Sequence, residues 1–135
     1  MTSETEESLK HKSKRLKRLL EELNGKTVVV EGKKDRNALE NSGITGRIEI
    51  LNASPENVAE RLQGVEEVVV LTDFDRRGKQ LASLLEEHLH AHRATPNMEA
   101  RRAFRYVLGI TYFENLCKKL EEFHLECKKK GVKVI

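Results

Sequence analysis

One stretch of the sequence joins a buried strand to an acidic tip, and it limits the possible folds more than any other. Residues 68–78 read Val-Val-Val-Leu-Thr-Asp-Phe-Asp-Arg-Arg-Gly. A short, uninterrupted run of mostly β-branched residues is typical of a strand buried on both faces, as strands of parallel sheets are. The run ends at Asp73 and Asp75, and the residues after them can begin a helix. A strand, an acidic tip and a helix in this order indicate a site on an α/β sheet.

An earlier stretch has the same order of features. Residues 27–35 read Thr-Val-Val-Val-Glu-Gly-Lys-Lys-Asp, with Glu31 directly after four β-branched residues. If the two strands are adjacent in a doubly wound sheet, both end at the crevice where the strand order changes direction. Glu31, Asp73 and Asp75 would then meet there, although 42 residues separate the first two.

The rest of the chain alternates between helical and strand patterns. Helices are predicted from the spacing of apolar residues, from capping residues and from Gly and Pro at the ends of the patterns. The predicted ranges are 9–23, 33–40, 54–63, 78–92, 96–108 and 113–130. A capping box is predicted at Thr111 to Glu114. Strands are predicted at 27–30, 47–52 and 67–72, with a short fourth strand at 93–95. Residues 1–8 are expected to be frayed, and residues 132–135 to form an edge strand or a loose tail.

These elements predict an α/β fold with three layers, in which helices cover a Rossmann-like, mostly parallel sheet with right-handed crossovers. At 135 residues the chain is long enough for one globular unit. Within it we expect an N-terminal amphipathic basic helix in residues 1–26, an α/β core in residues 27–95 and a C-terminal helical extension in residues 96–135. The leucines of residues 9–23 pack inward, while the cations around them either form a solvated face or contact a phosphate backbone.

Composition and charge give only partial information about binding partners and cellular location. The net charge of +3 and the pI near 8.9 are compatible with a polyanionic partner but do not require one. No apolar run approaches the ~20 residues of a membrane span, and no signal peptide is recognisable, so a soluble cytoplasmic protein is expected. Cys117 and Cys127 have no metal-ligand spacing and are expected to be reduced thiols.

Three carboxylates at one crevice favour a bound cation. Close carboxylates repel one another unless a positive charge neutralises them. Oxygen ligands of this kind suit Mg²⁺, with Mn²⁺ as a substitute. Each acidic tip is followed by cations near a helix N-terminus, which favours a phosphate ligand; these are Lys33, Lys34, Arg76 and Arg77. The pattern as a whole indicates phosphoryl transfer or phosphodiester chemistry.

The two motifs together resemble the signature motifs of the Toprim domain, which topoisomerases, bacterial-type primases and several nucleases share. The resemblance covers residues 27–95, and it is greatest to the small stand-alone Toprim proteins of archaea. It implies that Asp73 and Asp75 bind Mg²⁺ and that Glu31 completes the metal site or acts as general acid or base. A topoisomerase also needs a nucleophilic tyrosine, and Tyr106 and Tyr112 lie in no recognisable motif.

Three functions remain open at this point. The first is a Mg²⁺-dependent nuclease or related phosphoryl-transfer enzyme acting on RNA or DNA, in which Glu31 moves a proton while Lys33 and Arg76 hold phosphates. The second is a nucleic-acid-binding module without turnover inside a larger RNA- or DNA-processing assembly, using residues 9–23 and 101–105. The third is hydrolysis of a small phosphorylated molecule. The sequence does not distinguish RNA from DNA.

Overall fold

Two short runs of β-branched residues form the middle of a four-stranded parallel sheet. The computed structural model describes residues 4–52 and 54–133. Its strands follow the order β2-β1-β3-β4, and every neighbouring pair is parallel. Their bounds are β1 Thr27–Val30, β2 Arg47–Ile50, β3 Val68–Leu71 and β4 Pro96–Asn97. The α/β class and the parallel sheet predicted from the sequence are therefore confirmed.

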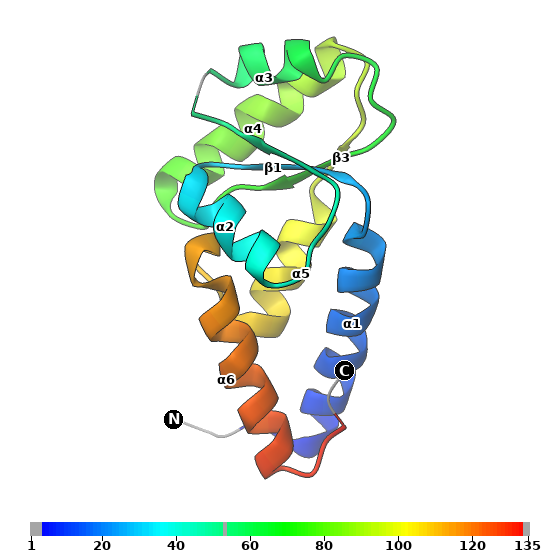
Figure 1. The fold of residues 1–135 in the computed structure, drawn as a ribbon, viewed down its shortest axis with the longest axis vertical. Coiled ribbons are helices and arrows are strands. Elements are labelled where there is room, and N and C mark those ends of the chain that lie inside the picture. Colours follow the sequence, from blue (N-terminus) through cyan, green and yellow to red (C-terminus); the bar gives the residue numbers. More distant parts are fainter. Residues whose placement is uncertain (1–3, 53, 134–135) are drawn as a thin grey trace.

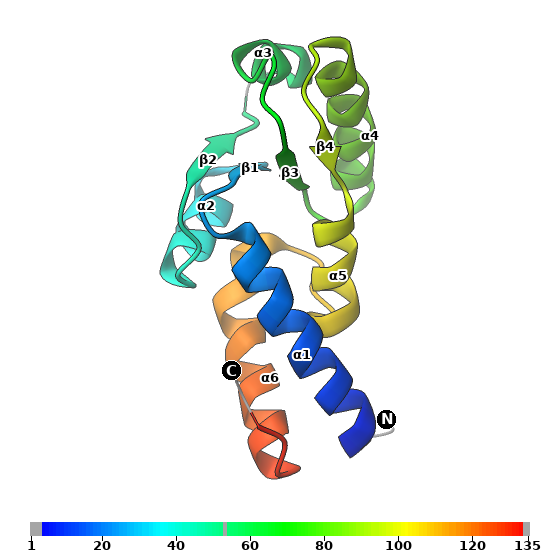
Figure 2. The same cartoon turned by 90° about the vertical axis from the view of Figure 1, so that its right-hand side faces the viewer.

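Helices cover both faces of this sheet, so the molecule has three layers (Figure 1). The helices are α1 Glu6–Leu23, α2 Lys33–Asn41, α3 Pro55–Arg61, α4 Arg76–Ala91, α5 Glu99–Leu108 and α6 Leu116–Lys129, with a 3₁₀ turn, η1, at Phe113–Asn115. α3 and α4 lie on one side of the strands, while α1, α2, α5 and α6 lie on the other (Figures 1 and 2). Within the described ranges, no helix combines the length and the apolar character needed to cross a membrane.

Alternate side chains of β1 and β3 point into two separate hydrophobic cores. Val28, Val30 and Leu71 join the core formed with α1, α2, α5 and α6. Val29 and Val70 join the core under α3 and α4. This alternation follows from the two-residue period of a strand, and it explains why residues 28–30 and 68–71 are all apolar and buried.

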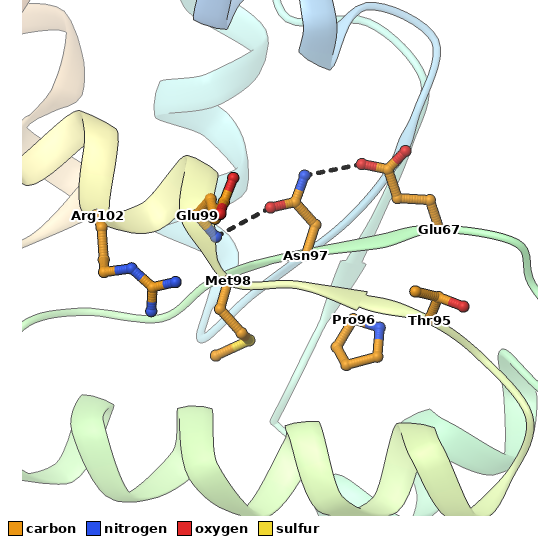
Figure 3. Close-up of a pocket in the computed structure, with 7 residues that line it drawn as sticks. All are labelled: Glu67, Thr95, Pro96, Asn97, Met98, Glu99 and Arg102. Carbon is orange, nitrogen blue, oxygen red and sulfur yellow. Dashed lines mark hydrogen bonds between the residues drawn. The ribbon is translucent and has the colours of Figure 1, made fainter.

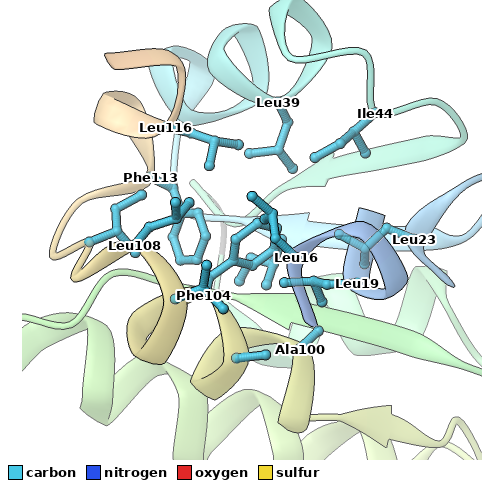
Figure 4. Packing of buried hydrophobic residues seen from close by; sticks show 14 of the residues in the cluster. Leu16, Leu19, Leu23, Leu39, Ile44, Ala100, Phe104, Leu108, Phe113 and Leu116 are labelled. Atoms are coloured by element: carbon cyan, nitrogen blue, oxygen red, sulfur yellow. The ribbon is translucent and has the colours of Figure 1, made fainter. Parts of the chain in front are cut away.

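The N-terminal basic helix is an integral part of the larger core. Its inward residues Leu16, Leu19 and Leu23 are at most 1% exposed and pack against α5 and the sheet (Figure 4). The helix begins at Glu6, so the expectation that residues up to Ser8 are frayed is wrong for 4–8; residues 1–3 lie outside the described ranges. The Thr5 side chain accepts a hydrogen bond from the Ser8 N–H and caps the first turn.

The fourth strand and the helix after it begin later than the sequence predicted. β4 is at Pro96–Asn97 rather than at 93–95, and α5 begins at Glu99 rather than at residue 96. Pro96 is tolerated because β4 is an edge strand, where a missing N–H costs no ladder hydrogen bond. Asn97 Oδ1 accepts hydrogen bonds from the N–H groups of Glu99 and Ala100, so the helix starts after Asn97.

A side-chain cap also moves the start of α4, and a predicted capping box is missing before η1. α4 begins at Arg76 instead of residue 78, because Asp75 Oδ1 accepts the Gly78 N–H at 2.7 Å and acts as the N-cap. The predicted capping box at 111–114 does not form, since Thr111 Oγ1 accepts from Arg105 instead. Leu84 of α4 is 45% exposed, although Leu85 and Leu89 of the same helix are fully buried. At the C-terminus, Val132 is buried, and residues 134–135 lie outside the described ranges.

Truncating an inward leucine of α1 should show how much of the stability this helix carries. Leu19→Ala leaves a cavity in the core and should lower the free energy of unfolding by about 3 kcal/mol. Leu125→Ala, on the outer surface of α6 where the side chain is 59% exposed, is the matched control and should cost less than about 0.5 kcal/mol. Urea denaturation measures both. Equal losses for the two variants would contradict the packing described here.

Candidate functional site at the carboxyl edge of the sheet

The in-register pairing of β1 and β3 brings the two acidic tips together. Thr27 pairs with Val68 and Val30 pairs with Leu71, so the residues that follow the two strands leave the sheet at the same edge. There the Asp73 N–H donates a hydrogen bond of 2.6 Å to Glu31 Oε2. The adjacency of the two strands, which the sequence left conditional, is thus confirmed.

The C-terminal part of the chain also contacts this edge. The Phe113 N–H, at the start of η1, donates to Asp73 Oδ1 at 2.8 Å. One residue along the tip, the Phe74 N–H donates to the Thr111 carbonyl oxygen at 2.8 Å. These bonds orient the Asp73 carboxylate from a segment 40 residues away, and no sequence pattern had pointed to them.

A further carboxylate, Asp35, lies beside the pair. It is only 7% exposed, and its Oδ2 accepts the Gly32 N–H at 2.9 Å at the start of α2. The Gly-x-x-Asp spacing at a helix start is a capping pattern that could have identified this residue from the sequence. Asp35 therefore fixes the backbone directly after Glu31 and adds a third acidic group to the site.

Burial and crowding change the proton affinity of these carboxyl groups. Burial raises the pKa of Asp73 to about 7; the neighbouring Asp35 and Glu31 raise it too, against the effect of the Phe113 N–H. Burial also raises the pKa of Asp35, with smaller contributions from the charges of Glu31 and Glu114. A hydrogen bond to the Glu31 side chain also raises the pKa of Asp73. The acidic edge thus favours either a bound proton or a cation.

Two arginines of α5 support the tip after β3. Arg101 donates to the carbonyl oxygens of Thr72 at 2.8 Å and Asp73 at 2.6 Å, and its guanidinium lies 4.2 Å from the Phe74 ring centre. Arg105 lies 5.3 Å from the same ring and donates to the Ile110 carbonyl oxygen. Within the basic group at 101–105, these two guanidinium groups thus have intramolecular partners.

An open hollow of about 340 Å³ adjoins the acidic pair. Carboxylates and cations line it together: Glu31, Asp35, Asp73, Glu114, Lys33, Lys34 and Arg77, with Gly32. The structure thus brings five of the seven predicted site residues to one hollow. Arg76 is exposed and is not part of this lining, and neither is Asp75. In the part of the chain that the structure describes, Lys33, Lys34 and Arg77 form no ion pair.

The Asp75 carboxylate faces the first turn of α4 rather than Glu31. Its Oδ1 is the N-cap acceptor of that helix. Across residues 4–52 and 54–133, no three His, Cys, Asp or Glu side chains are grouped as a metal site. Among the described residues, the expected set of Glu31, Asp73 and Asp75 is therefore not preformed as a metal site, and the metal-binding roles of these three residues stay predictions.

A second hollow, of about 380 Å³, lies near the opposite end of β3 (Figure 3). It is lined by Glu67, Thr95, Pro96, Asn97, Met98, Glu99 and Arg102. Glu67 accepts hydrogen bonds from Lys26 at 2.7 Å and from the Asn97 side-chain amide at 2.8 Å, and these two bonds lower its pKa. Its carboxylate ties the start of β1 to β3 and β4, which is a structural role.

Gly78 allows the first turn of α4 to approach the tip of β3. A Cβ at this position would lie 2.0 Å from the Asp73 carbonyl oxygen and 2.5 Å from its carbon. On the other side, the buried Thr72 hydroxyl donates to the Gly78 carbonyl oxygen at 2.7 Å. The glycine of the second motif is thus required by close backbone packing directly against the site.

Comparison with known proteins gives one family match, two similar proteins and one similar solved structure. A model of the Toprim domain family matches residues 25–97. A UPF0292 protein of Methanosarcina barkeri is 36% identical over 100 residues, which cover 69% of this chain and 70% of that protein. A UPF0292 protein of Methanocaldococcus jannaschii is 44% identical over 69 residues, 48% of this chain and only 54% of that protein. The solved structure of a protein from Aquifex aeolicus aligns with a TM-score of 0.64 at 26% identity, covering 76% of this chain and 95% of that one.

Replacing Gly78 should displace the site and destabilise the fold. Gly78→Ala places a methyl group against the backbone of Asp73, so the free energy of unfolding should fall by roughly 3 kcal/mol. Gly32→Ala is the matched control after the first strand, because its added Cβ would meet only Asp35 Oδ2 at 3.8 Å. Urea denaturation compares the two. A Gly78→Ala protein as stable as Gly32→Ala would contradict the close approach.

The raised pKa of Asp73 predicts that metal-free protein loses stability as the pH rises from about 5 to about 8. The folded state keeps a proton up to about pH 7, whereas the unfolded state releases it near 3.8, so the advantage of the folded state disappears above pH 7. Asp73→Asn retains an acceptor for the Phe113 N–H but cannot ionise. The decrease in the free energy of unfolding with pH should therefore be smaller than in wild type, by an amount on the order of 1 kcal/mol after allowance for solvent screening.

The measurement is urea denaturation at pH 5.5 and pH 8 in chelator. Glu66→Gln is the control, because Glu66 is exposed and precedes β3 at the end opposite to the site. Identical pH slopes in wild type and Asp73→Asn would show that the acidic edge does not titrate as described.

Proposed function

The chain belongs to the Toprim domain family, and from this premise we propose that it acts on nucleic-acid phosphodiesters with the help of Mg²⁺, as a nuclease or related phosphoryl-transfer enzyme. One observation carries the proposal: the Glu31–Asp73 pair borders a hollow whose other lining includes Lys33, Lys34 and Arg77. Carboxylate oxygens can bind a divalent metal ion, and the neighbouring Lys and Arg side chains can bind phosphate oxygens, so the hollow suits a metal-bound phosphate group. RNA and DNA are both candidate substrates.

The donor set fits a hard divalent cation. Glu31 and Asp73 offer carboxylate oxygens, and Mg²⁺ typically binds one or two protein carboxylates while keeping several waters. Burial, and then the charges of Asp35 and Glu31, raise the pKa of Asp73, and a bound cation would stabilise its ionised form. Asp75 would join by leaving its capping position or through water. When bound, Mg²⁺ supplies Lewis-acid stabilisation of phosphoryl oxygens.

The protein side chains divide the remaining tasks. Glu31 Oε2 already accepts the Asp73 N–H, so its other oxygen is the atom that would take a proton from an attacking water. Lys33 and Lys34 in the first turn of α2, and Arg77 in the first turn of α4, would hold phosphate oxygens. Both helices add free N–H groups and the positive end of a dipole at the same edge.

A second candidate is a nucleic-acid-binding module without turnover, acting within a larger RNA- or DNA-processing assembly. The use of Asp75 as a helix cap favours it, because that oxygen is committed to the Gly78 N–H. The exposed cations of α1 would add affinity; Lys14, Lys17 and Arg18 are exposed and form no ion pair within the described ranges. Binding of this kind weakens steeply with salt.

Divalent-dependent cleavage separates the two candidates. Purified protein is incubated with structured RNA, single-stranded DNA and duplex DNA in Mg²⁺, in Mn²⁺ and in chelator. We expect cleavage of at least one substrate with either ion and none in chelator. Glu31→Gln and Asp73→Asn should each lower the rate by roughly 100-fold or more, because they remove a proton acceptor and a carboxylate ligand.

Glu66→Gln is again the control and should cleave like wild type. Circular dichroism and urea denaturation check that the variants are folded. Cleavage at the wild-type rate by both site variants would overturn the enzymatic proposal. Salt-sensitive binding of a nucleic acid, with no cleavage under any of these conditions, would favour the second candidate instead.

A further inference from the structure

A third hollow, separate from the one at Glu67, lies next to the acidic hollow along the seam between α2 and the C-terminal segment η1–α6. Its volume is about 370 Å³, and it shares Lys34 and Glu114 with the acidic hollow. Because the same two side chains line both, the hollows are adjacent sections of one groove. α2 packs directly on η1 and α6, so the floor of this groove is a helix–helix contact.

The groove has an acidic section, which is the hollow at Glu31 and Asp73, and a section that is rich in side-chain amides, called the amide section below. Asn37 and Asn41 lie one turn apart on α2 and are exposed, and Asn115 faces them from the end of η1. None of these amide groups has a hydrogen bond to another described residue. An amide offers a donor and an acceptor side by side, and both can be used by the edge of a nucleobase, whereas a phosphate uses only the donor.

We propose that this section holds the nucleotide next to the phosphate in the acidic site, so that the ligand is a single-stranded segment of a polynucleotide. The proposal rests on the proposed function of the acidic site. Lys34, at the junction, would contact the connecting phosphate, while the Glu114 carboxylate beside it would keep the backbone on the Lys34 side. Base edges are free to meet side-chain amides where nucleotides are unpaired.

The size of the groove agrees with a ligand longer than one nucleotide. Each section alone is near the lower end of the ~300–1,000 Å³ range of ligand pockets. A small phosphorylated molecule would fill the acidic section and leave the amide section without a role. The groove therefore favours a polynucleotide over the small-molecule substrate that the sequence left open.

Cys117 gives a direct report on occupancy. It is half-buried, lines the amide section, and its Sγ lies 3.3 Å from the Ser42 hydroxyl and 3.4 Å from the Ala38 carbonyl oxygen. Cys127, the other cysteine, is 0% exposed, and burial raises its thiol pKa. A ligand in the groove should therefore slow alkylation of Cys117 while Cys127 stays unreactive with or without ligand.

The test compares wild type with Asn37→Ala/Asn41→Ala, which preserves the fold because alanine favours helix more than asparagine does. Asn57→Ala is the matched control, since Asn57 is exposed on α3 across the sheet. Binding of labelled 12-nucleotide single strands of RNA and DNA, the matching duplexes and a mononucleotide is measured by fluorescence anisotropy. Ca²⁺ replaces Mg²⁺ to supply divalent charge to the carboxylates.

We expect the double variant to bind single strands about tenfold more weakly than wild type and Asn57→Ala. Single strands should protect Cys117 in wild type, and the mononucleotide should not. If wild type and the double variant bind single strands with the same affinity and with the same protection of Cys117, the amide section is not a subsite. That result would overturn this inference and leave the proposed function of the acidic site standing. An equal loss with duplexes would overturn the single-strand assignment. No binding of any strand by wild type would overturn the proposed function as well.

Discussion

The pairing of β1 with β3 in register is the constraint on which the rest of the site depends. It places Glu31 and Asp73 at one edge, where the backbone N–H of one residue meets the carboxylate of the other at 2.6 Å. If one of these strands slipped by one residue, each of its side chains would move from one hydrophobic core to the other. The register is therefore strongly determined. Precise placement of the acidic pair is therefore a consequence of apolar packing.

The helices outside the α/β core support the site from one side. Phe113 orients the Asp73 carboxylate, and Arg101 holds the carbonyl oxygens of the same tip. Both come from the C-terminal helical part, whose position in turn depends on the leucines of α1 in a shared core. The N-terminal helix thus contributes to the geometry of the acidic edge through packing, whatever its cations bind.

Local signals predicted the fold well and the element ends less well. Ser54 caps α3 and Pro55 begins it, one residue after the predicted start at 54, and Gly109 follows the end of α5 as the predicted range 96–108 requires. The changes at the starts of α4, α5 and η1 share one cause, which is a polar side chain with a hydrogen-bond partner that sequence spacing did not reveal. Asn97 caps α5 from the edge strand, and Thr111 accepts from Arg105 in place of forming a capping box. Asp35 carried a readable capping signal, whereas Arg101 carried none.

The sequence by itself determined the α/β class, the order of its strands and helices, and the acidic residues at the two strand ends, because these follow from side-chain periodicity and local breaks. Tertiary structure decided which of the groups that the sequence could bring together do meet. It paired Glu31 with Asp73, turned Asp75 toward the first turn of α4, and placed the asparagines of α2 opposite η1. Such contacts join residues far apart in the chain, and competition for hydrogen-bond partners in the folded state selects among them.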